Sequence, residues 1–578
     1  MSEDRPQLWL PAHLSRRQLI LGGSAVMVAG LAACGSDKKS TSGTTATTAA
    51  PTATTSASTT GATTGETTGA TSATTGAGTA TTTGETTATT AAAGDVKTGG
   101  TFRLGVVGGT NDIIDGQYIV AKPDQARLVA GWETLVTYNE KFEISYDEGL
   151  AESVEAKAAD TYIIKLRDGI EFHNGKSLSA DDLVYSFQRL IDKDLGLAPA
   201  LQAYLEPSGI KKLDNLSVQI TLTQGVVTFL DSIAGYAFGV VPEGYKREDP
   251  VQVGTGPFVL KSFTPGSESV HEKFANYWKP GKPYLDAVNI IDYADATALV
   301  NALLSGQIDA ACDVPFAQVS TVESDSNYKI LESQAGSFLP ITMAVDQAPF
   351  DDVRVRQAFR LIVDREEMVE RVLSGYGRIA NDLYSPFDAG YASDLPQRVQ
   401  DIEGAKALLK EAGQENLSID LFAPNDTAGL ADMANVFADQ AKKAGVTVNV
   451  KVLGSEYWGD EYCKRTFATS FWGTRPYLNQ VAAGNLHDAS YPETHWPPEG
   501  SKFADEYKEA LATVDNEARY KIMHKMQEEE YESGGNIIAF FNSLLDAYNS
   551  SVQGLVERPN VLNLDHFGRG FQNIWLDS

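Results

Sequence analysis

The chain after about residue 98 predicts a mixed α/β fold, because of two patterns and its length. A strand-like run from Gly100 to Gly105 precedes a helix-like stretch from Pro123 to Leu135. Between Asp401 and Leu453, helix, strand, helix and strand signals follow one another, as in β-α-β units that form largely parallel sheets covered by helices. Roughly 480 residues with ordinary aromatic content suffice for two or three domains that share one ligand-sized cleft.

The remaining elements follow from capping residues and apolar spacing. Ser179 and Asp182 form a capping-box pattern. The apolar residues of the helix that follows are Leu183, Phe187, Leu190 and Ile191. Asp351 or Asp352 can cap one further helix that ends near Gly375. Its apolar face is formed by Val355, Ala358, Phe359, Ile362 and Val363. A helix-rich run from Phe503 to Glu532 then precedes a strand from Ile537 to Tyr548.

The first residues have the features of an export signal. Arg16 and Arg17 precede an apolar run, Leu19 to Leu31, that is shorter than the roughly 20 residues needed to span a bilayer. Leu31-Ala32-Ala33-Cys34 follows. These residues resemble a twin-arginine signal ending in the lipobox of bacterial lipoproteins. The resemblance implies that residues 1–33 are a signal peptide and that Cys34 is lipidated, which anchors the protein at the outer face of the cell membrane. A plain signal peptide with a chance cysteine is the alternative.

A low-complexity segment separates Cys34 from the α/β body. Residues 36–98 consist almost wholly of Thr, Ala, Gly and Ser, so they offer no apolar area to offset the entropy cost of ordering. We therefore expect residues 34–98 to form a lipidated, disordered tether, either unmodified or O-glycosylated.

The charge balance limits the partners of the protein. The sequence has 47 basic and 76 acidic residues, a net charge of −29, which disfavours nucleic acid and anionic membrane surfaces as partners. Apart from Cys34, only Cys312 and Cys463 are present. They either pair in an oxidising exterior or remain two separate thiols, and their number and spacing give neither a disulfide framework nor a metal motif.

Four long stretches carry a resemblance to a known family. They are residues 166–191 (LRDGIEFHNGKSLSADDLVYSFQRLI), 253–278 (VGTGPFVLKSFTPGSESVHEKFANYW), 349–365 (PFDDVRVRQAFRLIVDR) and 516–540. In this order they resemble bacterial extracellular solute-binding proteins of family 5, which serve peptide, nickel and opine ABC importers. The resemblance implies a two-lobed fold of the periplasmic-binding-protein type (type II, cluster C) with an extra subdomain in the first lobe.

The resemblance also implies the domain boundaries. The first lobe spans residues 99–339 and 546–578, with the extra subdomain at about 141–250, and the second lobe spans residues 340–545. The strands around 338–345 and 540–547 would be the two hinges. A ligand that touches both lobes stabilises the closed form by its differential affinity for that form, and a permease can recognise the closure.

The ligand loop of the second lobe is the most specific site prediction. In dipeptide- and oligopeptide-binding relatives this loop reads Trp, two small residues and Asp, and the Asp holds the ligand's ammonium group. The matching residues here are Trp472, Gly473, Thr474 and Arg475, so the charge of the last position is reversed. A guanidinium favours a carboxylate or phosphate through paired hydrogen bonds. The alternative is that Arg475 pairs with an acid of the protein itself.

Further candidates come from both lobes. Tyr457 and Trp458 could cover an apolar or sugar-like ligand, or belong to the core. The loop that begins at Gly108 lies where relatives line the pocket. Its candidate residues are Asp112, Asp115 and Gln117. Tyr236 and Phe238 are two more candidates, and a strand of the core explains them nearly as well.

The signatures of an exported enzyme are incomplete. The stretch His271 to Ala275 begins like a zinc-protease helix but has Ala where the second His is required. The Ser-x-x-Lys and Lys-Thr-Gly motifs of penicillin-binding proteins occur in the wrong order. His487 and His495 lack a third metal ligand in sequence.

The sequence therefore predicts a non-enzymatic, monomeric binding protein without cofactor or metal. It would capture a peptide-like or anionic organic solute and deliver it to an ABC permease. A surface solute sensor with the same fold is the alternative, and an exported hydrolase is a weaker one.

Overall fold

The computed structural model describes residues 96–119, 122–139, 141–235, 237–249, 252–425, 427–459, 461–556 and 570–577. The predictions for the signal peptide, Cys34, nearly all of the tether and Tyr236 lie outside these residues. Among the described helices, none combines the length and the apolar character that a membrane crossing requires.

The first sheet has the strand order β12-β19-β11-β1-β10-β9-β8, and β14 also pairs with β19. Its strands are β1 (Thr101–Val107), β8 (Phe258–Thr264), β9 (Glu268–Lys273), β10 (Ala287–Tyr293), β11 (Ala310–Ala311), β12 (Tyr328–Phe338), β14 (Gly377–Ile379) and β19 (Phe540–Asn549). Its neighbouring helices are α2 (Lys122–Gly131), α6 (Ala296–Leu304) and α7 (Phe316–Glu323). The central strand β1 runs parallel to β10 and β11, so the strand and helix predicted at the start of the body are confirmed.

The second sheet has the order β16-β15-β17-β13-β18. Its strands are β13 (Ile341–Met343), β15 (Ser418–Pro424), β16 (Thr447–Leu453), β17 (Phe467–Thr469) and β18 (Asn536–Ile537). The helices of this part are α8 (Val353–Ile362), α9 (Arg365–Leu373), α10 (Ile402–Glu411), α11 (Leu430–Lys443), α12 (Tyr477–Gly484), α13 (Phe503–Ala512) and α14 (Asn516–Ser533), with short turns η2 (Ser455–Trp458) and η3 (Tyr462–Lys464). Because β15 and β16 pair in parallel and α11 connects them, the predicted β-α-β unit is confirmed.

A separate antiparallel sheet, β4-β5-β7-β6, is inserted in the first part of the chain. It consists of β4 (Ala151–Ala158), β5 (Thr161–Leu166), β6 (Ile210–Lys212) and β7 (Ser217–Thr221), together with α3 (Ala180–Leu190), α4 (Pro199–Gln202), α5 (Phe229–Ala234) and η1 (Pro207–Gly209). The Ser179 amide donates to the Asp182 carboxylate at 3.0 Å, which confirms the capping box of α3. This sheet lies within residues 141–250, where the sequence predicts the extra subdomain, and the boundaries themselves remain predictions.

Two short pairs of strands complete the described part. They are β2 (Thr137–Tyr138) with β3 (Ile144–Ser145), and β20 (Val552–Gln553) with β21 (Trp575–Leu576), the latter next to η4 (Gly570–Asn573).

Two of the predicted elements are wrong in extent. The single helix expected to end near Gly375 is two helices, α8 and α9, because the chain becomes extended at Val363 and Asp364 caps α9 by accepting from the Glu367 amide. The single strand expected from Ile537 to Tyr548 is divided between β18 in the second sheet and β19 in the first.

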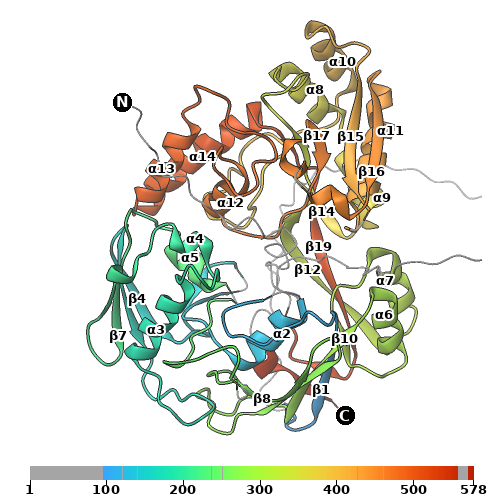
Figure 1. Cartoon of the computed structure of the whole chain (residues 1–578). Helices are drawn as coiled ribbons and strands as arrows, with labels where there is room; N and C mark the ends of the chain where they lie inside the picture. The colour runs from blue at the N-terminus through green and yellow to red at the C-terminus, as the bar shows by residue number, and fades with distance from the viewer. Residues whose placement is uncertain are drawn as a thin grey trace, which may run out of the picture. The chain divides into compact units, whose positions relative to one another are not determined.

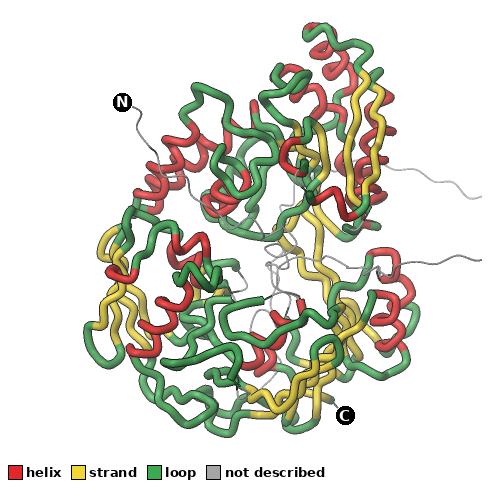
Figure 2. Tube along the Cα trace, viewed as in Figure 1, coloured by secondary structure: helices red, strands yellow, loops and turns green. Residues whose placement is uncertain are grey.

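The chain therefore passes between the two large sheets at two points close to these strands. Leu339 and Pro340 separate β12 from β13, and Ile538 and Ala539 separate β18 from β19. Because β12 and β19 pair with each other, both passages leave the first sheet side by side (Figure 2). The sequence predicts the two hinges near these passages, and this role remains a prediction.

Candidate functional site

The pairing of β12 with β19 is interrupted just before the first passage. The register is regular up to Ser333 and Leu544, and resumes at Ser337 and Asn542. Three residues of β12 (334–336) thus lie opposite one of β19 (Ser543), so the backbone of Ala335 and Gly336 leaves the ladder and is available to other partners. Bulges of this kind are common next to functional sites.

The predicted ligand loop is fixed to this interrupted strand. Phe338 and Trp472 exchange two backbone hydrogen bonds, of 3.0 and 2.9 Å. The Gly336 amide, released by the bulge, donates to Oγ1 of Thr474 at 2.9 Å. A Cβ atom at position 336 would lie 3.1 Å from the Thr474 methyl carbon and 3.4 Å from Cδ2 of Phe387, so glycine permits this close approach. The loop from Trp472 to Arg475 is therefore held at the point where the chain passes between the sheets.

The Trp472 side chain is held on several sides. Its indole Nε1 donates to the carboxylate of Glu493 at 3.1 Å, and the other oxygen of Glu493 accepts from the Ser470 hydroxyl at 2.7 Å. The Tyr491 ring contacts the indole edge to face, with centroids 5.9 Å apart. The Arg475 guanidinium lies 5.0 Å from the indole centroid, which is a cation–π contact. Trp472 is 7% exposed and Arg475 is half-buried, so the guanidinium is the more accessible of the two groups.

Tyr457 and Trp458 lie in the packed interior next to this loop. Tyr457 is fully buried, and its hydroxyl donates to the Thr469 carbonyl. Trp458 is half-buried and contacts Tyr457, Tyr462 and Phe471, the last at 5.5 Å. Phe471 directly precedes Trp472, so Tyr457 and Trp458 support the loop by packing next to it. A direct contact of Tyr457 or Trp458 with the ligand remains a prediction.

The three polar candidates of the first sheet are engaged in buried ion pairs or, for Gln117, in buried hydrogen bonds. Asp115 accepts from Arg189 at 2.7 Å and from Arg247 at 2.8 Å. Gln117 is fully buried, accepts from Arg189 at 2.8 Å and donates to the carbonyls of Ser186 and Gly239. These bonds join the loop after β1 to α3, so Asp115 and Gln117 contribute to the position of the extra subdomain.

Asp112 belongs to a second buried cluster, at the carboxyl ends of β1 and β10. Arg127 of α2 contacts the carboxylates of Asp112 at 3.1 Å, Asp124 at 3.3 Å and Asp292 at 2.5 Å. Burial, which outweighs the attraction of Arg127, raises the pKa of Asp292 to about 7. One guanidinium thus faces three carboxyl groups, and one proton on Asp292 reduces their repulsion near neutral pH.

Phe238 is half-buried and lines a small apolar hollow of the extra subdomain. The other residues that line it are Leu135, Leu183, Ser186, Phe187, Leu190, Ile233 and Val240. Its wall has no charged group, so the hollow offers packing and no recognition of a charge. The role of Phe238 in ligand binding remains a prediction.

Sequence reasoning missed two residues next to the loop, Glu493 and Arg378. Glu493 stands in a Tyr-, Pro- and His-containing stretch and carries no motif. Arg378 lies on β14, a strand of three residues whose pairing with β19 has no periodic signal in the sequence. Only the long-range strand pairing brings Arg378 to the interrupted part of β12.

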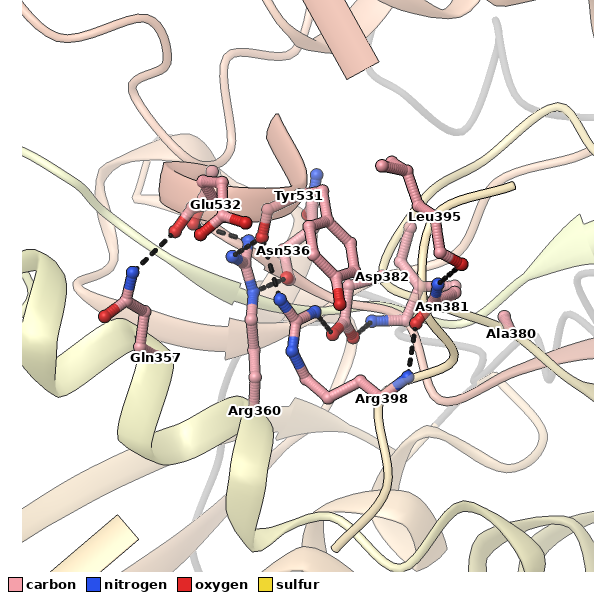
Figure 3. Close-up of polar contacts among 12 residues, drawn as sticks. Gln357, Arg360, Ala380, Asn381, Asp382, Leu395, Arg398, Tyr531, Glu532 and Asn536 are labelled. Carbon is pink, nitrogen blue, oxygen red and sulfur yellow. Dashed lines mark hydrogen bonds and ion pairs between the residues drawn. The ribbon is translucent and has the colours of Figure 1, made fainter. Parts of the chain in front are cut away.

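The arginines of the quoted stretch 349–365 have structural partners. Arg360 donates to the carbonyls of Asn536 and Tyr531 at 2.9 Å each (Figure 3), and it also donates to those of Glu530 and Gly534. Asp382 accepts from Arg398 at 2.5 Å and from Arg365 at 2.6 Å, and its other oxygen accepts from the Ile538 amide at 2.9 Å. This cluster therefore fixes the backbone at the second passage.

The two cysteines of the body lie beside different sheets. Cys312 follows β11 of the first sheet and is buried, which raises the pKa of its thiol well above the usual range. Cys463 lies in η3, beside the second sheet. Within the described residues no group of three or more His, Cys, Asp or Glu side chains has the arrangement of a metal site.

The arrangement so far is that of a two-lobed binding protein: two α/β sheets, two passages between them, and a loop with an aromatic ring and a cation beside the passages. Residues 145–485 match the sequence profile described as bacterial extracellular solute-binding proteins, family 5. The chain belongs to this family of extracytoplasmic binding proteins.

Known proteins agree with this assignment. The chain is 28% identical over 471 residues to the dipeptide-binding protein of Escherichia coli, covering 72% of this chain and 85% of that protein. The ABC transporter substrate-binding protein CtaP of Listeria monocytogenes has the same fold, with a TM-score of 0.74, 21% identity and coverage of 83% of this chain and all of that one. The binding protein AgaA of Agrobacterium tumefaciens, solved with agropinic acid, gives a TM-score of 0.67 at 23% identity, covering 83% and 99%. The predicted fold class is therefore confirmed.

Proposed function

We propose that this protein captures a small organic solute, peptide-like or anionic, between its two lobes and delivers it to an ABC permease. Membership of the solute-binding family and the 28% identity to a dipeptide-binding protein support capture of a small solute. The lipobox pattern at Cys34 supports attachment to the outer face of the cell membrane, near the permease.

The observation that carries the proposal is the attachment of the Trp472–Arg475 loop to β12 through Phe338 and Gly336. A solute that contacts this loop lies next to both passages between the sheets. Its binding energy can therefore act on the relative position of the lobes, which is how a binding protein converts capture into a change of shape.

The charge of Arg475 indicates the kind of solute. A guanidinium favours an oxyanion, with which it can form paired hydrogen bonds, and here it lies against the Trp472 indole. This favours a solute with a carboxylate or a similar anionic group over one held by its ammonium group.

The test begins with the solute that the protein itself retains. Native mass spectrometry of the chain purified from its own host would detect a bound small molecule, whose affinity is then measured by calorimetry. Arg475→Ala is expected to weaken binding by about tenfold or more, because a charge-assisted pair of hydrogen bonds contributes roughly 1.5–3 kcal/mol.

The matched control is Arg354→Ala, an exposed arginine of α8 that pairs with Asp352. It is expected to bind like the wild type. If the Arg475→Ala variant binds the solute with the same affinity as the wild type, Arg475 does not contact the solute. Turnover of the retained molecule by the purified protein would contradict the proposed function.

A further inference from the structure

Arg378 differs from the other arginines near the passages in what surrounds it. It lies on β14, opposite Phe541 of β19, and Phe541 in turn lies opposite Phe338 of β12. Directly opposed residues of antiparallel strands project from the same face of a sheet, so Arg378, Phe541 and Phe338 share one face. This places a guanidinium on the strands that lead into both passages.

Two aromatic rings flank the Arg378 guanidinium. Its carbon lies 4.6 Å from the centroid of Phe387 and 5.1 Å from that of Phe541. Nη2 donates to the Ala335 carbonyl at 3.2 Å, and the buried Nε has no hydrogen-bond partner. Burial lowers the pKa of Arg378, and in the described part of the chain no carboxylate forms an ion pair with it.

The neighbouring arginines have a carboxylate or several backbone carbonyls as partners, as Arg365 has in Asp382. Arg360 donates to four backbone carbonyls, and Arg398 pairs with Asp382 and with the Tyr531 carbonyl. Arg378, by contrast, has one carbonyl, two aromatic rings and the nearby Tyr391, and among the described residues no carboxylate pairs with it. A partly buried cation without a counter-charge is costly, and a negative group from outside the protein would offset that cost.

Arg378 and the ligand loop form hydrogen bonds with two adjacent residues of the bulge in β12. The bulge releases the Ala335 carbonyl, which accepts from Arg378, and the Gly336 amide, which donates to Thr474. The Phe387 ring that covers Arg378 also contacts Phe142 from the first part of the chain, with centroids 6.0 Å apart. The surroundings of Arg378 thus include groups from both sides of the passages.

We propose that Arg378 binds a carboxylate of the captured solute, so that the solute belongs to the class of small organic acids. This inference rests on the proposed function and makes it more specific. Phe387 and Phe541 lie against the guanidinium, and its terminal N–H groups can donate to a planar carboxylate while Nε stays buried.

The experiment compares pairs of probes that differ only in charge. Succinate is compared with succinamide, and alanyl-alanine with its C-terminal amide, by calorimetry at pH 7 on the full chain. In the wild type each acid is expected to bind at least about tenfold more tightly than its amide. In Arg378→Met, which keeps the apolar stem and removes the charge, this advantage is expected to disappear.

Arg354→Met is the control and is expected to keep the preference for the acids. If Arg378→Met does not fold, Arg378→Lys serves instead, and it is expected to reduce the preference because an ammonium cannot form the two parallel bonds. The inference is overturned if the substituted protein prefers acids as the wild type does, or if the wild type prefers the amides or binds none of the four probes. Retention of a solute detected by native mass spectrometry would leave the proposed function intact in each of these cases.

Discussion

Glu530 shows how a single buried carboxyl group can make stability depend on pH. It lies on α14, almost completely buried, and accepts from the hydroxyls of Tyr384 and Tyr477 and from the side-chain amide of Asn485. Burial raises its pKa from 4.5 to about 7, although these hydrogen bonds act in the opposite direction. Between these two values the folded protein keeps a proton that the unfolded chain has lost, so the free energy of unfolding falls as the pH rises through this window.

We predict that Glu530→Gln removes this dependence. The variant is neutral at every pH, so its stability relative to the wild type should increase by up to about 3 kcal/mol between pH 4.5 and pH 8. Urea denaturation at a series of pH values measures the difference in unfolding free energy between variant and wild type. Burial also raises the pKa values of Asp231 and Asp292, but both proteins contain these residues, so their contributions cancel in the difference. Glu517→Gln, an exposed residue of the same helix, is the control, and a pH profile for Glu530→Gln that parallels the wild type would contradict the assignment.

At the scale of elements, α8 stabilises the end of α14. The last carbonyls of any helix lack partners within that helix. Arg360 and Arg356, four residues apart and therefore on one face of α8, donate to carbonyls at the end of α14: Arg360 to those of Glu530, Tyr531 and Gly534, and Arg356 to that of Ser533. The contact orients the chain as it enters β18 and the second passage.

We predict that Arg360→Met destabilises the protein by about 2–4 kcal/mol, because it leaves several buried carbonyls without donors. Burial of the guanidinium lowers the pKa of Arg360 to about 9, which shows that burying this cation is costly. The substitution removes that cost and so offsets part of the lost stability. Urea denaturation measures the change, and Arg354→Met on the exposed side of the same helix is expected to change stability by less than about 0.5 kcal/mol. A loss of similar size in both variants would show that the carbonyl contacts contribute little.

The elements with a local signal could be predicted from the sequence, and those fixed by distant partners could not. The capping residues Ser179 and Asp401 mark the starts of α3 and α10, and the β-α-β unit follows from apolar spacing. The division between β18 and β19 depends on which sheet each part joins, and no local pattern encodes that choice. The same applies to the site: the Trp472 loop carries a sequence motif, and its role as ligand loop remains a prediction, whereas Arg378 reaches this loop only through the pairing of β14 with β19.

The burial of Asp115 and Gln117 illustrates a second limit of sequence reasoning. A polar residue in a glycine-rich loop is compatible both with a ligand contact and with an internal ion pair. The partners of Asp115 are Arg189 and Arg247, which lie 74 and 132 positions further along the sequence. Only the tertiary structure brings them into contact.

At the scale of the whole body, the extra subdomain contacts the second part of the chain away from the two passages. Helix α13 lies beside this subdomain and away from β12 and β19 (Figure 1), and the Val227 amide donates to the Leu511 carbonyl of α13 at 3.1 Å. If the passages act as hinges, these contacts must separate when the protein opens to exchange solute. A covalent link across them should therefore stop the exchange.

Gly225 and Ala512 offer a place for such a link. A Cβ atom at position 225 would lie 3.6 Å from the Cβ of Ala512, which is within the range of disulfide bonds. We predict that the double variant Gly225→Cys, Ala512→Cys retains its solute through dialysis when oxidised and releases it after reduction, because the closed arrangement cannot open while the bond is intact. Native mass spectrometry before and after reduction measures the retained fraction. The two single cysteine variants, which keep Cys312 and Cys463, control for other pairings. Equally fast loss of solute from the oxidised and reduced double variant would mean that exchange does not require these surfaces to part.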